Sequence, residues 1–534
     1  MNCIFICVFN QEKYVEMFYL LLESIFIYGN LDDNTNILVY TSTHFMNIIK
    51  QSHLFNYEKV KFEINDTYND VNKACKSRLD LFSLPSITNY KKILYLDTDI
   101  LIKDDINKIF NVCEEDILYV LGEGSIDDEE LGNCWGKLLF GDDIHKYDDK
   151  TAFTSGIILF NNCDKIKNLF IEINEDIINR PYNFGCYDQP YIVYNAFKYN
   201  LYNNKVLSSL AVNQDYNIHS DKVIHHFPGG PGVYYYKIYN MTIFLNSIKD
   251  FTINNNITNA KQYIDDYLLP IINNCGESLE GNIFMLHATT TYTDVYLNKT
   301  KNISNLLLNK NINNVMEIGF NSGFSTLLML LTNPNMYITC FDLGEHKYTI
   351  PCYEKLKETF GERINIIIGD STKTLQNITN NYDLIHIDGG HSTEVANSDI
   401  IHSYRLSKQG TILIMDDYDF CNLHDLWDSY IIKYNLKTLN INVYDSQHHD
   451  IKCINKCINK LENKTYTWEN SYIKFLDNFK MDAFGEGFYE FIDKNNIIAK
   501  FGGREHIITF NDNYTSFSST RKDDLEIVIG KIIE

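Results

Sequence analysis

Residues 91–102 read KKILYLDTDILI, an apolar run that carries two carboxylates. Its composition is typical of a strand inside a sheet, where the side chains on both faces are buried. Asp97 and Asp99 stand in this run, one residue apart. Because side chains two positions apart on a strand point to the same face, both carboxylates can address one point at the strand end. Two hard oxygen ligands suit Mg²⁺ or Mn²⁺, and a pair of solvated acids is the alternative.

Similar apolar runs alternate with helical stretches along most of the chain, which indicates an α/β fold. At 534 residues the chain is too long for one hydrophobic core. Changes in the pattern divide it into four expected segments: residues 1–246, an asparagine-rich connector with helical pieces at 247–290, a second α/β series at 291–450 and a β-rich segment at 451–534.

Composition and charge argue against several classes of protein. The net charge of −23 disfavours nucleic-acid binding, which needs clustered lysine and arginine. The chain contains no apolar run of the roughly 18 residues that a membrane span requires. The opening residues MNCIFICVFN lack the basic leader of a signal peptide, so we expect a cytoplasmic protein without a membrane span. The sequence leaves homo-oligomerisation open.

Other motifs surround the two acids in a fixed order: FNQEKYVEM (9–17), KSRLDLFSL (76–84), LDTD (96–99), FTSGIILFN (153–161), CYDQPYIVYNAF (186–197) and VIHHFPGGPG (223–232). This order resembles the nucleotide-sugar glycosyltransferases of the glycogenin and bacterial lipopolysaccharide galactosyltransferase family, family 8, which have the GT-A fold. The resemblance covers nearly all of residues 1–245. It implies a UDP-sugar donor, a glycan acceptor, Mn²⁺ or Mg²⁺, and retention at the anomeric carbon.

The resemblance also implies roles for individual residues. The metal ligands would be Asp97, Asp99 and His226, with His225 as the fallback. The catalytic pair beneath the reacting sugar would be Asp188 and Gln189. The donor contacts would be Asn10, Tyr14, Arg78, Ser155, Gly156, Gly229 and Gly230.

Two positions depart from the family pattern, and three have ordinary alternatives. Thr154 stands where asparagine is common. The family often has a lysine shortly after the histidine, and here backbone NH groups of the glycine-rich stretch or Lys237 would take its place. Taken alone, Tyr14 is also an ordinary aromatic at a helix start, Asp188 a helix cap and His226 a core histidine.

The second α/β series opens with VMEIGFNSGFST (315–326), a strand that runs into a glycine turn and a helix. Gly319 and Gly323 leave room for a ligand but do not fit the dinucleotide spacing G-x-G-x-x-G. The stretch resembles motif I of class I S-adenosylmethionine methyltransferases. That resemblance implies cofactor contacts from Glu317, Gly319, Gly323, Asp342 and Asp370, and a plain β–α turn is the alternative.

Carboxylates also end the next two strands, HIDGGHS (386–392) and ILIMDDYD (412–419). In a doubly wound sheet these ends are neighbours, so Asp388, Asp416 and Asp417 converge. Converging carboxylates repel unless a cation or a proton compensates, which favours Mg²⁺. The pattern resembles metal-dependent O-methyltransferases, including those that act on sugars of macrolide antibiotics. It implies these three ligands and His391 as the base, and caps of the following helices are the alternative.

The last segment carries short aromatic runs separated by turn residues, which predicts an antiparallel unit of roughly five strands. We expect its core to contain Trp468, Phe475, Phe484, Phe488, Phe491 and Phe501. FGGREH (501–506) is typical of a hairpin turn that exposes Arg504 and His506. A carbohydrate-binding or oligomerising appendage is the functional alternative.

We therefore predict an α/β multidomain protein with a GT-A nucleotide-sugar fold, a Rossmann-like class I methyltransferase fold and a small antiparallel β-rich unit. The predicted function is bifunctional: transfer of a sugar from a UDP-sugar to a glycan, and S-adenosylmethionine-dependent O-methylation of a sugar hydroxyl. Two alternatives stay open. One catalytic domain is active and the other is a binding or scaffold module, or a protein glycosyltransferase is joined to an independent methyltransferase.

Overall fold

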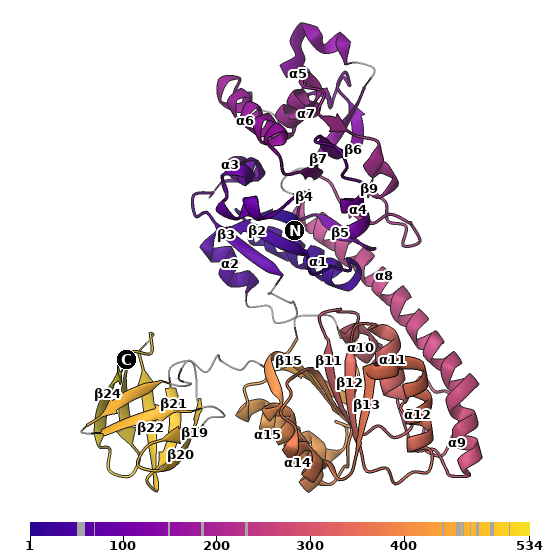
Figure 1. Cartoon of the computed structure of the whole chain (residues 1–534), viewed down its shortest axis with the longest axis vertical. Helices are drawn as coiled ribbons and strands as arrows, with labels where there is room; N and C mark the ends of the chain where they lie inside the picture. Colours follow the sequence, from indigo (N-terminus) through magenta and orange to yellow (C-terminus); the bar gives the residue numbers. More distant parts are fainter. Residues whose placement is uncertain are drawn as a thin grey trace.

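The computed structural model describes residues 1–533 except 51–58, 69, 148–149, 183–185, 230–232, 440–442, 455–460, 462–463, 470, 477–479, 492–495 and 512. Two α/β units and a C-terminal β unit follow one another along the chain (Figure 1). The predicted α/β multidomain architecture with a β-rich end is thereby confirmed.

The first unit is built on a mixed seven-stranded sheet. Its strand order is β3 (Val60–Ile64), β2 (Thr35–Thr41), β1 (Asn2–Val8), β4 (Lys92–Leu96), β7 (Thr151–Asn161), β6 (Leu118–Ser125) and β8 (Tyr202–Asn203). β1 is buried along most of its length and pairs in parallel with both β2 and β4. The order reverses between β1 and β4, and the crevice beyond such a reversal is where ligands bind in open α/β sheets.

Short elements complete this unit around the sheet. A second sheet of three strands has the order β5 (Ile100–Ile102), β10 (Ile224–His226) and β9 (Ala211–Asn213). Helix α1 buries residues spaced three and four apart, which is why its sequence packs as a helix. The helices are α1 (Glu12–Tyr28), α2 (Thr43–Ile49), α3 (Val71–Lys76), α4 (Asn107–Asn111), α5 (Lys137–Phe140), α6 (Asp164–Asn179) and α7 (Gln189–Lys198).

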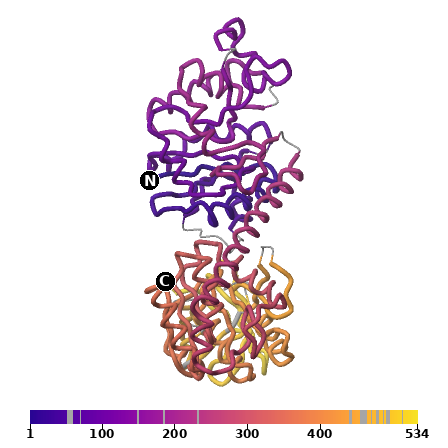
Figure 2. Tube along the Cα trace, turned by 90° about the vertical axis from the view of Figure 1, so that its right-hand side faces the viewer, coloured from indigo at the N-terminus to yellow at the C-terminus, as the bar shows by residue number. Residues whose placement is uncertain are grey.

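A long helix joins the two α/β units. Helix α8 (Tyr234–Tyr263) packs against α1 of the first unit and then against α10 (Leu297–Leu307) and α11 (Phe324–Thr332) of the second (Figures 1 and 2). A π-helical turn at Ile264–Leu268 and helix α9 (Leu269–Cys275) continue it. The polar-looking connector therefore contributes Ile253, Ile257 and Leu268 to the core of the second unit.

The second unit is a doubly wound sheet with the order β13 (Ile364–Ile368), β12 (Tyr337–Asp342), β11 (Asn314–Ile318), β14 (Tyr382–Ile387), β15 (Ser407–Asp416) and β16 (His449–Cys453). All neighbours are parallel except β15 and β16. The order reverses between β11 and β14, so this sheet repeats the pattern of the first and sets a second ligand edge. The remaining helices are α12 (Thr349–Phe360), α13 (Ser371–Thr374), α14 (Thr393–Arg405) and α15 (Cys421–Lys433).

The C-terminal unit is a closed antiparallel barrel with eight strands in its described part, where roughly five were expected. The strands are β17 (Thr465–Trp468), β18 (Ser471–Phe475), β19 (Lys480–Asp482), β20 (Glu486–Phe491), β21 (Asn496–Phe501), β22 (Arg504–Phe510), β23 (Ser516–Arg521) and β24 (Ile527–Ile533). Trp468, Phe475 and Phe501 are buried in its core as predicted.

Three details of this barrel differ from the prediction. Phe488 is exposed because the next residue of β20, Tyr489, points inward. Phe484 is exposed in a turn with φ 56°. His506 is buried and stacks on Phe501, whereas Arg504 is exposed as expected. The side chain of Phe491 lies outside the described residues.

Within the described part of the chain, every helix is too short or too polar to cross a lipid bilayer.

Candidate active sites

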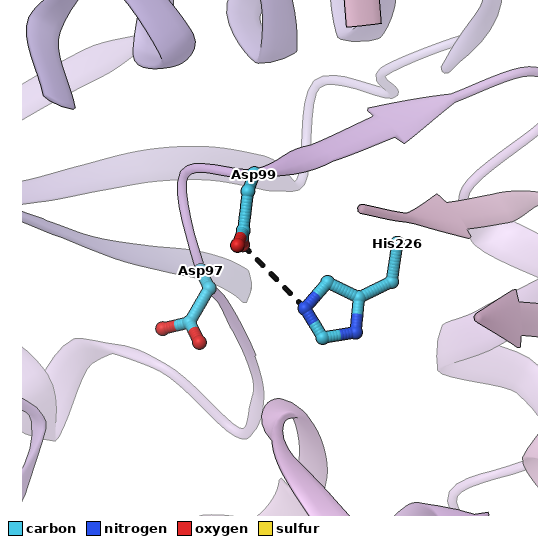
Figure 3. A group of neighbouring side chains, drawn as sticks. All are labelled: Asp97, Asp99 and His226. Carbon is cyan, nitrogen blue, oxygen red and sulfur yellow. Dashed lines mark ion pairs between the residues drawn. The ribbon is translucent and has the colours of Figure 1, made fainter. Parts of the chain in front are cut away.

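The first site gathers Asp97, Asp99 and His226 at the crevice beside β4 (Figure 3). β4 ends at Leu96 and the chain bends before β5, so the two acids lie in a turn and not on a strand as expected. Both acids nevertheless lie beside His226, which comes from β10, antiparallel to β5. The Nε2 atom of His226 lies 3.5 Å from Oδ1 of Asp99.

The hydrogen bonds of this cluster leave ligand atoms free for a cation. The Nδ1 atom of His226 lies 2.8 Å from the amide oxygen of Asn213. An amide oxygen only accepts, so Nδ1 carries a proton and Nε2 is the ring nitrogen that faces the acids. Oδ1 of Asp99 is buried without a hydrogen-bond partner, while Oδ2 accepts from Nζ of Lys237 at 2.6 Å. Burial would raise the pKa of Asp99, but Lys237 and His226 lower it, so the carboxylate is charged.

Gly156 supplies the space next to these ligands. A Cβ atom at this position would lie 2.9 Å from Cε1 of His226 and 3.0 Å from Oδ2 of Asp97. The cluster therefore has two carboxylates, an imidazole nitrogen and room between them, which fits a divalent cation such as Mn²⁺ or Mg²⁺. The fallback His225 lies elsewhere, because its Nδ1 hydrogen-bonds the carbonyl of Asp215 and its ring packs on Phe244.

Arg78 ties the metal-type cluster to Asp188. Its Nε lies 2.9 Å from Oδ2 of Asp188, and its Nη1 lies 3.4 Å from Oδ1 of Asp97. The guanidinium also stacks on Tyr95 and donates to the carbonyl of Ser155 at 2.6 Å. The resemblance placed Arg78 at the donor phosphates. In the structure Arg78 lines the cavity, but its side chain is largely buried against these acids.

Asp188 precedes α7 but its side chain makes no capping hydrogen bond. Burial raises the pKa of this carboxyl to about 6, against the opposing attraction of Arg78. Gln189 is fixed at both ends of its amide: Oε1 accepts from the backbone NH of Ser155 at 2.9 Å, and Nε2 donates to the carbonyl of Cys134 at 3.1 Å. Gln189 is thus fixed at the wall of the site, while Asp188 is buried against Arg78 and does not act as an ordinary helix cap.

A cavity of about 440 Å³ is lined by Asp97, Asp99, His226, Arg78 and Gln189, whereas Asp188 is buried outside the set of lining residues. Tyr14 lines it and makes an edge contact with Tyr234, and Gly229 lines it near Lys237. Asn10 lies outside the set of lining residues, in a left-handed turn with φ 76°. Gly230 falls outside the described residues.

The second site lies at the reversal between β11 and β14. Gly319 has φ 95°, and a Cβ there would come within 1.9 Å of the carbonyl oxygen of Asp388, so only glycine fits. Gly323 has φ 76° and lies directly before α11. Asp342 accepts from the backbone NH groups of Phe320 and Asn321 at 2.9 and 2.8 Å, which fixes the glycine loop.

Two predicted cofactor contacts have protein partners. Glu317 is fully buried behind the loop, where its carboxylate accepts from Thr326 and lies 3.0 Å from Nδ1 of His386. Asp370 caps α13 by accepting from the backbone NH of Thr372 at 3.0 Å. Glu317 is thus placed to support the loop and not to touch a ligand at its surface.

A buried chain of charges continues from Glu317 to the predicted metal ligands. Nε2 of His386 lies 3.2 Å from Oδ2 of Asp416, and the same oxygen accepts from Nζ of Lys299. Oδ1 of Asp416 accepts from the backbone NH of Asp417 at 2.8 Å. Ligand atoms of His386, Asp388 and Asp416 lie within 4.8 Å of one another, the spacing that a metal ion needs.

The other predicted residues of this site lie around a recess of about 10 Å³ at the ends of β14 and β15. Nε2 of His391 lies 2.7 Å from Oδ2 of Asp417, and this hydrogen bond raises the pKa of His391. Burial and the neighbouring Asp416 raise the pKa of Asp388 to about 7. The structure therefore pairs Asp417 with the predicted base.

Sequence reasoning missed Lys299 and His386. His386 stands two positions before Asp388 on β14, so the period of a strand could have flagged it as a neighbour of the site. Lys299 lies on α10, before the first strand of the sheet, and nothing in its local sequence marks it.

Residues 316–418 match the model of a methyltransferase domain family, which confirms the predicted resemblance for that part of the chain. No curated protein matches this sequence. Among solved structures, the apo WbbM bifunctional glycosyltransferase is 16% identical over 46% of this chain and 51% of its own, with a TM-score of 0.32. This chain thus spans about half the length of that protein.

Two other similar structures belong to the two classes that the sequence resembles. The galactosyltransferase LgtC in complex with donor and acceptor sugar analogues is 15% identical over 46% of this chain and 96% of its own, with a TM-score of 0.33. A putative caffeoyl-CoA O-methyltransferase from Staphylococcus aureus is 19% identical over 31% of this chain and 85% of its own, with a TM-score of 0.26.

Proposed function

We propose that this chain is a bifunctional glycan-modifying enzyme. Its first unit transfers a sugar from a UDP-sugar to a glycan with retention, and its second unit methylates a sugar hydroxyl with S-adenosylmethionine. The observation that carries the first activity is the cavity of about 440 Å³ lined by Asp97, Asp99 and His226, with the buried Asp188 held behind it by Arg78, a lining residue. A nucleotide-sugar needs such a combination of cation ligands and buried carboxylate.

In the first reaction, Asp97, Asp99 and His226 hold Mn²⁺ or Mg²⁺, which supplies neutralising charge for the departing diphosphate. Tyr14 stacks on the base, and Ser155, Gly156 and Gly229 border the donor. Lys237 faces the same edge through its contact with Asp99 and serves in place of the family lysine. The proposal also includes contacts of Asn10 and Gly230 with the donor.

Asp188 and Gln189 act on the sugar itself. As the bond to UDP breaks, positive charge develops on the sugar, and the carboxylate of Asp188 stabilises it while Gln189 orients the ring. Arg78 favours the charged form of Asp188 and holds both Asp188 and Asp97 in position because it lies between them. The acceptor hydroxyl then forms the new bond on the face that the diphosphate leaves, and its proton passes to the departing phosphate.

The experiment that tests this activity is a screen of UDP-sugars with Mn²⁺ and a panel of glycans, read by release of UDP. Activity that requires a divalent cation and is lost in Asp97→Ala and Asp99→Ala is the expected result. Full activity in EDTA would contradict the proposed cation site.

In the second reaction, Gly319, Gly323, Asp342 and Asp370 would hold S-adenosylmethionine, which would supply an electrophilic methyl group. His391 removes the proton of the acceptor hydroxyl as the oxygen takes the methyl group from sulfur. Asp417 orients His391 through the 2.7 Å hydrogen bond between them. The match of residues 316–418 to a methyltransferase domain supports this half.

The proposed methyl transfer does not use the Mg²⁺ that the sequence predicted at Asp388, Asp416 and Asp417. Both oxygens of Asp416 already accept from protein donors, and Asp417 binds His391. If only one domain is active beside a binding module, sugar transfer or methyl transfer should be seen alone. If a protein glycosyltransferase is joined to an independent methyltransferase, the methyl label should appear on molecules other than carbohydrate.

A further inference from the structure

We infer that the methyltransferase unit carries its cation within the protein: the Lys299 ammonium and the His386 imidazolium occupy the charge-balancing place of a divalent metal ion, and this site takes up none. The inference about ion binding stands on geometry alone. Its consequence, a methyl transfer that is independent of metal, rests on the proposed function.

The ammonium of Lys299 is inside the acidic cluster. Lys299 lies on the first turn of α10, which packs against α8 and α11, and it is largely buried. Its Nζ donates to Oδ2 of Asp416. A buried ammonium persists only where a carboxylate compensates it, so the two groups stabilise each other's charge. Burial would lower the pKa of Lys299, but Asp416, Asp388 and Asp417 together raise it.

His386 is a second internal cation. Its Nδ1 faces Oε1 of Glu317 at 3.0 Å, and its Nε2 faces Oδ2 of Asp416 at 3.2 Å. Ionised carboxylates only accept, so both ring nitrogens carry hydrogen and the ring is charged. An imidazolium with both nitrogens protonated has no lone pair to offer a metal ion.

The two internal cations balance two of the buried carboxylates without an added ion. The carboxylates of Glu317 and Asp416 face the ammonium of Lys299 and the imidazolium of His386, two negative groups against two positive ones. The nearby His449 accepts from the amide of Asn302 through Nε2, and its burial lowers its pKa to about 4, so it adds no charge. Part of the repulsion that favoured Mg²⁺ in the sequence is therefore already removed, because protein cations compensate Asp416.

The first site shows what an open cation site looks like in the same chain. There Lys237 also contacts a carboxylate, but Oδ1 of Asp99 accepts no hydrogen bond and faces Nε2 of His226 at 3.5 Å (Figure 3). In the second site Oδ2 of Asp416 has two protein donors and Oδ1 has one. The two clusters contain similar residue types, but Asp416 accepts from protein donors at both oxygens whereas Asp99 has an oxygen that accepts from none.

The test counts the divalent ions that the full chain binds, with no methyl acceptor present. Asp97→Ala/Asp99→Ala disables the first site, and free Mn²⁺ is followed by electron paramagnetic resonance during a titration with S-adenosylhomocysteine present. We expect no saturable binding at the second site. Saturable uptake that Asp416→Asn abolishes would overturn the inference, whereas uptake that survives Asp416→Asn lies elsewhere and agrees with it.

Variants of Lys299 give a second, positive readout in the same background. Lys299→Met removes the ammonium and leaves Asp388 and Asp416 to a cation, so it should gain Mn²⁺ uptake that Lys299→Arg does not show. A folded Lys299→Met chain without added uptake would contradict the role of the lysine as counter-ion. If this variant fails to fold, the titrations of the parent chain and of Lys299→Arg still decide. Neither titration depends on sugar or methyl transfer, so failure of the proposed function is seen separately.

Discussion

Gly156→Ala should weaken cation binding at the first site without unfolding the protein. The new methyl group would lie 3.0 Å from Oδ2 of Asp97 and 3.0 Å from Nε2 of His226, and ordinary contact begins at 3.4 Å. Each ligand atom must therefore recede by about 0.4 Å, whereas metal–ligand distances tolerate about 0.2 Å. We expect the affinity for Mn²⁺ to fall about 10- to 100-fold, or ~1.4–2.8 kcal/mol.

The fold should tolerate the same change. Gly156 does not need the left-handed backbone, and the atoms that the methyl group meets are the ends of side chains. The free energy of unfolding should thus change by no more than about 1 kcal/mol, since alanine also restricts the unfolded chain. Gly281→Ala is the matched control, because a Cβ there meets only ordinary contacts, the nearest at 3.6 Å.

The assay is calorimetric titration of the full chain with Mn²⁺ in the presence of UDP, followed by UDP release from the active donor. Gly281→Ala should bind Mn²⁺ like the parent chain. Parent-like affinity in Gly156→Ala would refute the reasoning, because it would mean that the cation lies away from Asp97 and His226.

Further predictions follow from the same contacts. Asp188→Asn should leave donor binding nearly unchanged and cut transfer about 100-fold or more, because the lost charge acts on the transition state. Binding and steady-state measurements separate donor affinity from turnover, and weaker donor binding at unchanged turnover would reverse the assignment. Methyl transfer should fall as pH falls through the raised pKa of His391, since only the neutral ring accepts a proton. Asp417→Asn should move this fall in the pH–rate profile to lower pH. A profile that does not move would contradict the assignment of His391 as the base. Lys299→Met should lower the free energy of unfolding by about 3–5 kcal/mol in denaturant titrations, while Lys373→Met, at an exposed lysine, should leave it unchanged. Equal changes in the free energy of unfolding for the two variants would contradict a stabilising buried ion pair at Lys299. The full chain should bind S-adenosylhomocysteine and not NAD in calorimetry, and saturable NAD binding alone would contradict the second site.

The sequence was sufficient to predict the two sheet edges and most of the residues on them. Each set of acids follows an apolar run, and the ends of parallel strands meet at one edge, so Asp97 with Asp99 and Asp388 with Asp416 could be placed before any coordinates. The reason offered for the first pair was wrong in detail. Asp97 and Asp99 converge through a turn between two sheets and not through alternation on one strand.

What could not be predicted depends on contacts between distant segments. Lys299 meets Asp416 only because α10 packs beside the sheet, and a lysine in a polar helix gives no local sign of burial. The connector looked polar, yet α8 buries one apolar stripe against two units. The barrel strands β17 and β19 are too short to show alternation, and β24 is apolar on both faces, so fewer strands were expected.

The central claim is that one chain carries both transfers to carbohydrate. The most direct measurement is a mass spectrum of a glycan acceptor after incubation of the full chain with a UDP-sugar, S-adenosylmethionine and Mn²⁺. The account predicts an acceptor that has gained a sugar and a methyl group, with the methyl group absent in His391→Ala and the sugar absent in Asp99→Ala. Methyl transfer confined to protein side chains, or an acceptor unchanged under every donor, would contradict it.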